Sequence, residues 1–367
     1  MNGGTGGTMP LGAAGSAAGA PNSGTGGALG PGAAGSGSNS AGVPGGGSGG
    51  TSGTNGAAGS SGAGGQAAVP STTGPVAQHG ALHVMGNRVV DAAGQPVQLR
   101  GMSLFWSQWS SYYVAGTVDQ LTDDWHATLV RAAVGVENDG GYLANPADNE
   151  AKLFAVVDRA IARGLYVIID WHDHHAQDHQ STAIDFFTRM ATKYGSSPNV
   201  LFEIYNEPLD IGWPAVKAYA QTVIAAIRGT GATNLVIVGT PNWSQDVDVA
   251  AGSPVTGQAD VAYTLHFYAA SHKQALRDKA KTALDAGLAL FVTEWGTCEA
   301  SGNGSVDQTE TKTWLDFLAQ NHIGWANWSL NDKAETCSAL TPEAGTTGPW
   351  TSGALTASGT LVKSLIP

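Results

Sequence analysis

Short apolar runs rich in strand-forming residues recur along the chain, and segments with a helical apolar period lie between them. The helical segments include EAKLFAVVDRAIARG, TAIDFFTRMATKYG and VKAYAQTVIAAIRGTG, and all three contain the glycine that often ends a helix. Strands that alternate with helices predict a parallel sheet with crossover helices, and eight such units favour closure into a (β/α)8 TIM barrel. The eight runs are VQLRGMS, TLVRAAV, LYVIIDW, NVLFEIYN, NLVIVGT, AYTLHFY, LALFVTEW and IGWANWS.

An open, doubly wound sheet is the competing architecture. Such a sheet usually carries a glycine-rich phosphate loop after its first strand, and no such loop follows VQLRGMS. Polar and aromatic residues gather instead at the carboxyl end of nearly every run, which is where a barrel places its active site. The pattern therefore favours the barrel.

The N-terminal part of the chain has a different composition. The first 75 residues contain no charged and no aromatic side chain, and the first formally charged residue is Arg88. Glycine, alanine and serine bury too little apolar surface to offset chain entropy, and the glycines lack the strict period of collagen. We predict a disordered linker over residues 1–77, joined to an upstream module, and one folded domain over residues 78–367.

A small β-hairpin is expected at the start of this domain. The stretch ALHVMGNRVVDAAGQPVQLRG holds two short alternating runs separated by turn residues. Since it precedes the first barrel strand, we expect it to cap the base of the barrel.

The charge balance excludes several kinds of partner. The formal net charge of −12 argues against nucleic acid and anionic membrane surfaces, because both require clustered lysine and arginine. No apolar run long enough for a membrane span and no signal peptide is visible. A neutral or weakly charged substrate fits better.

Two glutamates follow apolar strands at positions that would face one barrel mouth. Glu207 lies in EIYNEP, at the end of the fourth run, and Glu294 lies in FVTEWG, at the end of the seventh. Two carboxyl groups about 5 to 5.5 Å apart are what glycosidic cleavage with retention requires, one as acid and one as nucleophile. A solvated rim charge is the alternative for either residue alone.

The ordered motifs of residues 81–367 resemble glycoside hydrolase family 5, particularly its bacterial endo-β-1,4-glucanases, or cellulases. The resemblance rests on LRGMS, LVRAA, IIDWH, the Asn206-Glu207-Pro208 motif, LHFY, TEWG and NWSLNDKAE. It implies a retaining enzyme that cleaves internal bonds of a β-glucan polysaccharide. It also implies no cofactor and no metal, and we expect a monomer.

The resemblance assigns Glu207 as acid/base and Glu294 as nucleophile. Glu207 must be protonated when substrate binds, so we expect its pKa to be raised by burial and by the charge of Glu294. Glu294 must stay ionised, and we expect Arg131 and the Tyr268 hydroxyl to hold it so. A purely structural ion pair is the alternative for Arg131.

The remaining site residues also follow from the resemblance. Asn206 would hydrogen-bond the sugar 2-hydroxyl, and His172 and His266 would position the glutamates or substrate hydroxyls. For the two histidines, the alternative is packing in the core. Sugar platforms are expected at Trp109 and Trp328, glycone-side contacts at Lys333 and Glu335, and core packing at Trp171, Trp295 and Trp325.

Two residues depart from the family pattern. Phe105 stands where related cellulases carry a histidine, and Gly135 stands where they often carry an aromatic residue. Both departures would reshape the glycone end of the cleft.

The two cysteines, Cys298 and Cys337, fall in loops that this barrel would place at its mouth. We predict a disulfide between them, which suits a secreted enzyme, with two unpaired thiols as the alternative.

Three other functions remain open. The segment WHDHHAQDH, residues 171–179, clusters histidine and aspartate as a metal-dependent hydrolase would, but this reading leaves both glutamates without a role. A non-catalytic carbohydrate-binding barrel is a second possibility. An enzyme of the same fold that acts on mannan, xyloglucan or mixed-linkage glucan is the third, since loop shape sets the substrate.

Overall fold

The structure is a computed structural model that describes residues 71–342 and 344–366. Most of the predicted linker, residues 1–70, lies outside the described residues. The first described helix, α1, spans Pro75–His79 and is followed by Gly80 at φ 69°. Regular structure thus begins before residue 78, where the sequence analysis starts the folded domain.

Eight parallel strands form a closed barrel, as predicted. Each of the eight apolar runs supplies one strand, and the strands follow one another around the barrel in chain order before β10 closes onto β3. The barrel strands are β3 (Arg100–Leu104), β4 (Leu129–Gly135), β5 (Tyr166–His172), β6 (Val200–Glu203), β7 (Val236–Val238), β8 (Val261–Tyr268), β9 (Leu290–Gly296) and β10 (Trp325–Leu330).

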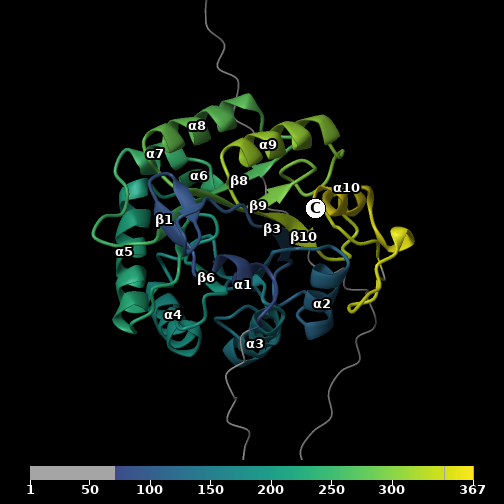
Figure 1. The fold of residues 1–367 in the computed structure, drawn as a ribbon, viewed down its shortest axis with the longest axis horizontal. Coiled ribbons are helices and arrows are strands. Elements are labelled where there is room, and N and C mark those ends of the chain that lie inside the picture. The colour runs from purple at the N-terminus through teal and green to yellow at the C-terminus, as the bar shows by residue number, and fades with distance from the viewer. Residues whose placement is uncertain (1–70, 343, 367) are drawn as a thin grey trace, which may run out of the picture. The chain divides into compact units, whose positions relative to one another are not determined.

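Helices surround the strands (Figure 1). The three helical segments read from the sequence are α3, α4 and α5, and α3 ends at Gly164, whose φ of 70° suits glycine. Among the described residues, no helix is long and apolar enough to cross a bilayer. The helices after α1 are α2 (Ala115–Asp123), α3 (Pro146–Arg163), α4 (Gln180–Tyr194), α5 (Trp213–Gly229), α6 (Pro241–Ser244), α7 (Val247–Ala251), α8 (Gln274–Asp285), α9 (Gln308–Gln320), the 3-10 turn η1 (Ser352–Ala354) and α10 (Ala357–Leu365).

The predicted hairpin is present before the barrel. Strands β1 (His83–Met85) and β2 (Arg88–Val90) pair antiparallel across a two-residue turn, in which Gly86 has a φ of 60°. Leu82 and Val89 belong to the same buried cluster as Ile168 and Ile237 of the barrel strands. The hairpin therefore covers the base of the barrel, as expected.

Strand alternation decides which side chains enter the barrel. In β4, Val130 and Val134 pack in the outer core with the helices, whereas Leu129 packs in the cluster at the base of the barrel. Arg131 is two residues from Leu129 and so shares its inward face. By the same period, Asp170 of β5 and Glu203 of β6 point inward, and all three charged side chains are fully buried.

Strand β9 breaks this alternation near its end. Thr264 pairs with Phe291 but His266 pairs with Glu294, so β9 contains one residue more than β8 over this stretch. The shift in register is that of a β-bulge, which can redirect a side chain. It lets Thr293 and Glu294, which are adjacent in sequence, both contact residues inside the barrel.

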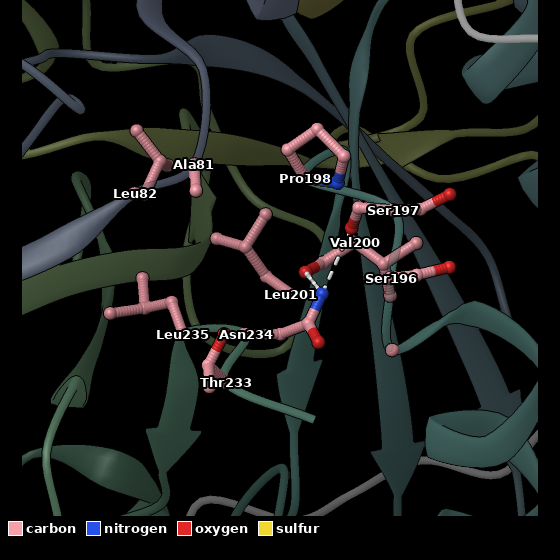
Figure 2. A pocket seen from close by; sticks show the side chains of 11 residues that line it. Ala81, Leu82, Ser196, Ser197, Pro198, Val200, Leu201, Thr233, Asn234 and Leu235 are labelled. Carbon is pink, nitrogen blue, oxygen red and sulfur yellow. Dashed lines mark hydrogen bonds between the residues drawn. The ribbon is translucent and has the colours of Figure 1, made fainter. Parts of the chain in front are cut away.

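A hollow of about 100 Å³ lies at the end of the barrel where the strands begin, beside the first residues of β6 (Figure 2). The Asn234 amide donates to the carbonyl oxygens of Ser197 and Val200, each at 2.9 Å, and braces this loop. The hollow is far too small for a saccharide chain. The polar residues that could do chemistry lie toward the carboxyl ends of the strands.

Candidate active site

Arg131 is the centre of a buried charged cluster. Its Nε and Nη2 donate to the two carboxylate oxygens of Glu203 at 2.7 and 3.1 Å, and Nη2 also lies 2.9 Å from Asp170 Oδ2. Its Nη1 donates to Glu294 Oε2 at 3.0 Å. One permanent positive charge is therefore shared by three buried carboxyl groups.

Glu294 has the two partners expected from the sequence. Besides Arg131, the Tyr268 hydroxyl donates to Glu294 Oε1 at 2.7 Å. The carboxyl group is fixed in orientation because each of its oxygens accepts one hydrogen bond. Neither donor is a group that readily gives up its proton near neutral pH.

Glu207 lies four residues beyond the end of β6, and the backbone of this segment runs alongside the end of β5. The amides of Asn206 and Glu207 donate to the carbonyl oxygens of Trp171 and Asp173, at 3.2 and 3.3 Å. Its carboxyl oxygens contact two histidines: His266 Nδ1 lies 2.9 Å from Oε1 and His174 Nε2 lies 3.3 Å from Oε2. Glu207 is thus bound to groups that can exchange a proton.

The pKa shift of Glu207 is the reverse of the one expected. Burial acts to raise the pKa of Glu207, but its hydrogen bonds with His174 and His266 outweigh burial and hold the pKa well below its usual range. Burial and the facing charge of Glu207 raise the pKa of Glu294, against the opposing effects of His266 and Arg131. The expectation of a raised pKa for Glu207 is wrong because it left the two histidines out.

Asn206 and His172 lie beside the glutamates but contact neither. The Asn206 Oδ1 accepts a hydrogen bond from Arg131 Nη2 at 2.6 Å, which leaves its buried Nδ2 without a partner among the described residues. The His172 Nδ1 lies 2.7 Å from Asp170 Oδ2. Of the two predicted histidines, only His266 touches a glutamate.

Aromatic side chains line the mouth next to His172. The Trp328 ring stacks on the His172 ring with centroids 5.1 Å apart, and Phe105 lies 5.5 Å from Trp328 and 6.4 Å from Trp109. Trp109 is 47% exposed, which leaves its ring free for a ligand. The three tryptophans expected in the core, Trp171, Trp295 and Trp325, are all buried there.

Both departures from the family pattern have a structural counterpart. The Lys333 ammonium lies 5.5 Å above the Phe105 ring and 2.8 Å from Glu335 Oε2, so Phe105 serves as an apolar support for this ion pair. A side chain at Gly135 would collide with Gln108, since an added Cβ would lie 1.8 Å from Gln108 Oε1. The glycine therefore leaves room for the end of the Gln108 side chain against β4.

Cys298 and Cys337 form the expected disulfide, with Cα atoms 5.5 Å apart. The Cys337 sulfur packs against Gly296, where an added Cβ would lie 2.7 Å from it. The bridge thus ties the end of β9 to the loop that carries Lys333 and Glu335.

Replacing both cysteines with serine is expected to lower the free energy of unfolding by about 4 kcal/mol, because the bridge closes a loop of 39 residues. In a domain of this size this corresponds to a fall in Tm of roughly 10 °C. Calorimetry of the double variant measures the fall, and wild type with a reductant should follow it. An unchanged Tm would show that the bridge adds nothing to stability.

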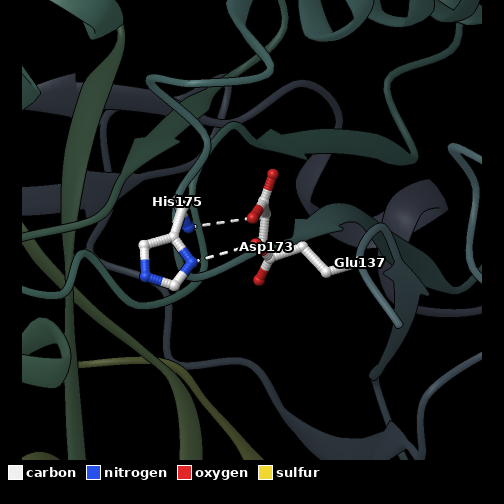
Figure 3. A group of neighbouring side chains, drawn as sticks. All are labelled: Glu137, Asp173 and His175. Carbon is white, nitrogen blue, oxygen red and sulfur yellow. Dashed lines mark hydrogen bonds and ion pairs between the residues drawn. The ribbon is translucent and has the colours of Figure 1, made fainter.

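A cluster of possible metal ligands lies on the segment that suggested a metal-dependent hydrolase. Atoms of Glu137, Asp173 and His175 lie within 4.8 Å of one another (Figure 3). Asp173 already accepts hydrogen bonds from the His175 amide and from the rings of His179 and Trp171, and His175 Nδ1 lies 2.9 Å from Glu137. These contacts order the loop that carries His174 to Glu207.

Sequence reasoning missed four residues of this site: Asp170, His174, Glu203 and Thr293. Asp170 and Glu203 are charged residues inside apolar strands, which is the signal that singled out Arg131. His174 was seen only as part of a possible metal site. Thr293 gave no signal, because strict alternation would place it on the face opposite to Glu294.

A pair of carboxyl groups this close together at the carboxyl end of a (β/α)8 barrel is the arrangement that glycoside hydrolases use. The sequence profile of the family described as Cellulase (glycosyl hydrolase family 5) matches residues 90–334. The chain belongs to glycosyl hydrolase family 5.

Named relatives and solved structures agree with this membership. Endoglucanase Z of Dickeya dadantii is 51% identical over 78% of this chain and 66% of its own length, and an endoglucanase of Clostridium saccharobutylicum is 44% identical over 78% and 65%. The chain thus spans about two thirds of the curated relatives it matches. The catalytic domain of a Thermobifida fusca endoglucanase superposes with a TM-score of 0.77 at 34% identity, covering 80% of this chain and 99% of that one.

Proposed function

We propose that this protein is a retaining endo-β-1,4-glucanase that hydrolyses internal bonds of cellulose or a related β-glucan. The observation that carries the proposal is the distance between the glutamates: one oxygen of Glu207 and one of Glu294 lie within 4.8 Å of each other. A retaining enzyme needs carboxyl groups about 5 to 5.5 Å apart, whereas an inverting enzyme needs about 6.5 to 9.5 Å to admit a water molecule.

In the first step Glu294 attacks the anomeric carbon, the bond to the leaving oxygen breaks, and that oxygen takes a proton from Glu207. Arg131 and Tyr268 hold the Glu294 carboxylate toward the substrate, which supports its assignment as nucleophile. Glu207 is bonded to His266 and His174, which can supply and take up a proton, and this supports its assignment as acid/base.

In the second step Glu207 takes a proton from water, which attacks the anomeric carbon and releases Glu294. Two inversions give net retention. The unpaired Asn206 Nδ2 would donate to the sugar 2-hydroxyl, a contact that strengthens in the transition state.

The β-glucan substrate is inferred from the relatives and from the aromatic mouth. The relatives are named endoglucanases, and a variant of the Thermobifida fusca domain has been solved in complex with cellotetraose. Trp109 and Trp328 would stack on pyranose rings, and Lys333 and Glu335 would bind hydroxyls on the glycone side. The disulfide suits an oxidising compartment, so we propose that the protein acts after secretion.

Replacing Trp109 with alanine is expected to raise KM for soluble cello-oligosaccharides about tenfold with little change in kcat, because a stacking platform binds substrate and transition state alike. Steady-state kinetics on cellopentaose measures this. The control is Met85→Ala, which removes another exposed large apolar side chain, from the hairpin at the base of the barrel. A fall in kcat at constant KM would count against a platform.

A substrate panel tests the proposed function. Reducing ends are measured with carboxymethylcellulose, mixed-linkage β-glucan, xyloglucan, β-mannan and xylan, for wild type and for Glu294→Ala. We expect release from the β-1,4-glucans by wild type alone. Faster release from mannan or xylan would reassign the substrate, and no release from any polymer would leave a carbohydrate-binding barrel.

A further inference from the structure

The role proposed for Glu207 leaves a question about its proton. The carboxyl group of an acid/base must deliver a proton, yet hydrogen bonds from two histidines favour its ionised form. The nearer histidine, His266, is buried and its second ring nitrogen is also engaged: Nε2 lies 2.9 Å from Thr293 Oγ1. What Thr293 contacts therefore bears on the proton of Glu207.

A continuous row of hydrogen bonds leads from Glu207 into the barrel. It passes from Glu207 Oε1 to His266 Nδ1 at 2.9 Å, from His266 Nε2 to Thr293 Oγ1 at 2.9 Å, and from Thr293 Oγ1 to Glu203 Oε1 at 2.6 Å. Arg131 holds Glu203 through both of its carboxylate oxygens. Thr293 lies on the inward face of β9 with Phe291, and the bulge in β9 brings Glu294 to the same side.

The directions of these hydrogen bonds are fixed by counting protons. Burial acts to raise the pKa of Glu203, but Arg131 outweighs it and lowers the pKa, so Glu203 is an ionised acceptor. The single hydroxyl proton of Thr293 then goes to Glu203, and the Thr264 hydroxyl, which also contacts Thr293 Oγ1, donates to that oxygen. Thr293 Oγ1 is left to accept from His266, so His266 Nε2 carries a proton whatever the state of Nδ1.

We propose that Thr293 and Glu203 are positioning residues that keep His266 protonated at Nε2, so that His266 Nδ1 and Glu207 share the one proton used in catalysis. This inference rests on the proposed function. In the resting state the shared proton lies on Nδ1, next to the Glu207 carboxylate. It moves to Glu207 and then to the leaving oxygen, which leaves His266 neutral with Nε2–H. The proton that water gives up in the second step returns by the same route.

The charged groups around His266 agree with a stored proton. Glu203 and Glu207 approach from the end of β6 and Glu294 from β9, while Arg131 on β4 and His172 on β5 oppose them. Burial acts to lower the pKa of His266, but the carboxylates outweigh it and raise the pKa to about 9. Tyr268, which lies on β8 with His266, contacts Glu294, and His174 contacts Glu207.

Thr293→Val tests the inference, because valine keeps the shape of threonine and removes the hydroxyl. Without an acceptor at Nε2, neutral His266 can carry its single proton on Nδ1 instead of Nε2. His266 then holds no additional proton that it can give to Glu207 near neutral pH. We expect the alkaline limb of the kcat/KM profile on cellopentaose to move down by about one pH unit or more. Thr293→Ser should keep the wild-type profile.

Nitrogen-15 NMR of histidine-labelled protein gives a second readout that does not depend on activity. We expect the His266 Nε2 signal to be of the protonated type in wild type and Thr293→Ser from pH 6 to 10, and of the unprotonated type in Thr293→Val at high pH, with assignment from His266→Gln. The matched control is Thr297→Val, whose buried hydroxyl pairs with Ser358 outside the row.

Two results would overturn the inference: an alkaline limb in Thr293→Val that coincides with wild type, or an Nε2 signal that Thr293→Val does not change. A uniform loss of kcat without a shift of the limb would indicate a merely structural role. Failure of the proposed function would look different, since wild type itself would then release no reducing ends while the NMR comparison could still be made.

Discussion

Replacing Glu294 with alanine is expected to lower kcat on β-glucans by roughly 10⁵-fold, which is about 7 kcal/mol of lost transition-state stabilisation. No other carboxylate described at the mouth is held by both Arg131 and Tyr268 toward the substrate. Arg131 keeps its contacts with Glu203 and Asp170, so the variant should fold. Steady-state kinetics on carboxymethylcellulose and circular dichroism measure the two effects.

Azide gives this variant a specific test. The small anion can occupy the space left by the carboxylate and attack the anomeric carbon of a dinitrophenyl β-cellobioside, giving a glycosyl azide of α configuration. The matched control is Glu299→Ala, which removes an exposed glutamate from the loop after β9 and should keep wild-type activity. Activity of Glu294→Ala within tenfold of wild type would refute the assignment.

Replacing Glu207 with alanine is expected to give a loss that depends on the leaving group. Protonation by a positioned acid contributes about 10²- to 10⁴-fold, so hydrolysis of cellopentaose should fall by about that factor. A dinitrophenolate leaves without a proton, and the first step with dinitrophenyl β-cellobioside should therefore keep its rate. The second step still needs a base, so the glycosyl-enzyme should accumulate and give a burst of dinitrophenol.

The comparison of the two substrates is its own control, because folding and substrate binding affect both. Stopped-flow absorbance measures the burst, and mass spectrometry of the quenched enzyme measures the added cellobiosyl group. Equal losses on both substrates, with no burst, would mean that Glu207 acts in some way other than proton transfer.

The barrel could be predicted because its signal is distributed over the chain. Eight apolar runs each supply one strand, and helical segments of ordinary period lie between them. The hairpin could be predicted as well, because Gly86 and Asn87 form a two-residue turn between two short runs of alternating apolar and polar residues. Such features depend on residues that lie close to one another in the sequence.

The sequence predicted which strand residues contact the glutamates. It did not predict the features that depend on contacts between strands. Arg131, Tyr268 and His266 meet the glutamates as expected because all of them lie on the inward faces of barrel strands. Thr293 was out of reach, because the bulge in β9 depends on how two neighbouring strands pair. The pKa shifts were out of reach as well, since that of Glu207 depends on His174 and His266 and that of Glu294 on burial and on the facing charge of Glu207.

The stereochemistry of the first product tests the central claim most directly. Proton NMR of cellopentaose hydrolysis, recorded before mutarotation, reports the anomer formed at the newly cleaved bond. Carboxyl oxygens of Glu207 and Glu294 within 4.8 Å of each other predict that the β-anomer appears first. An α-anomer appearing first would contradict double displacement and with it the roles given to both glutamates.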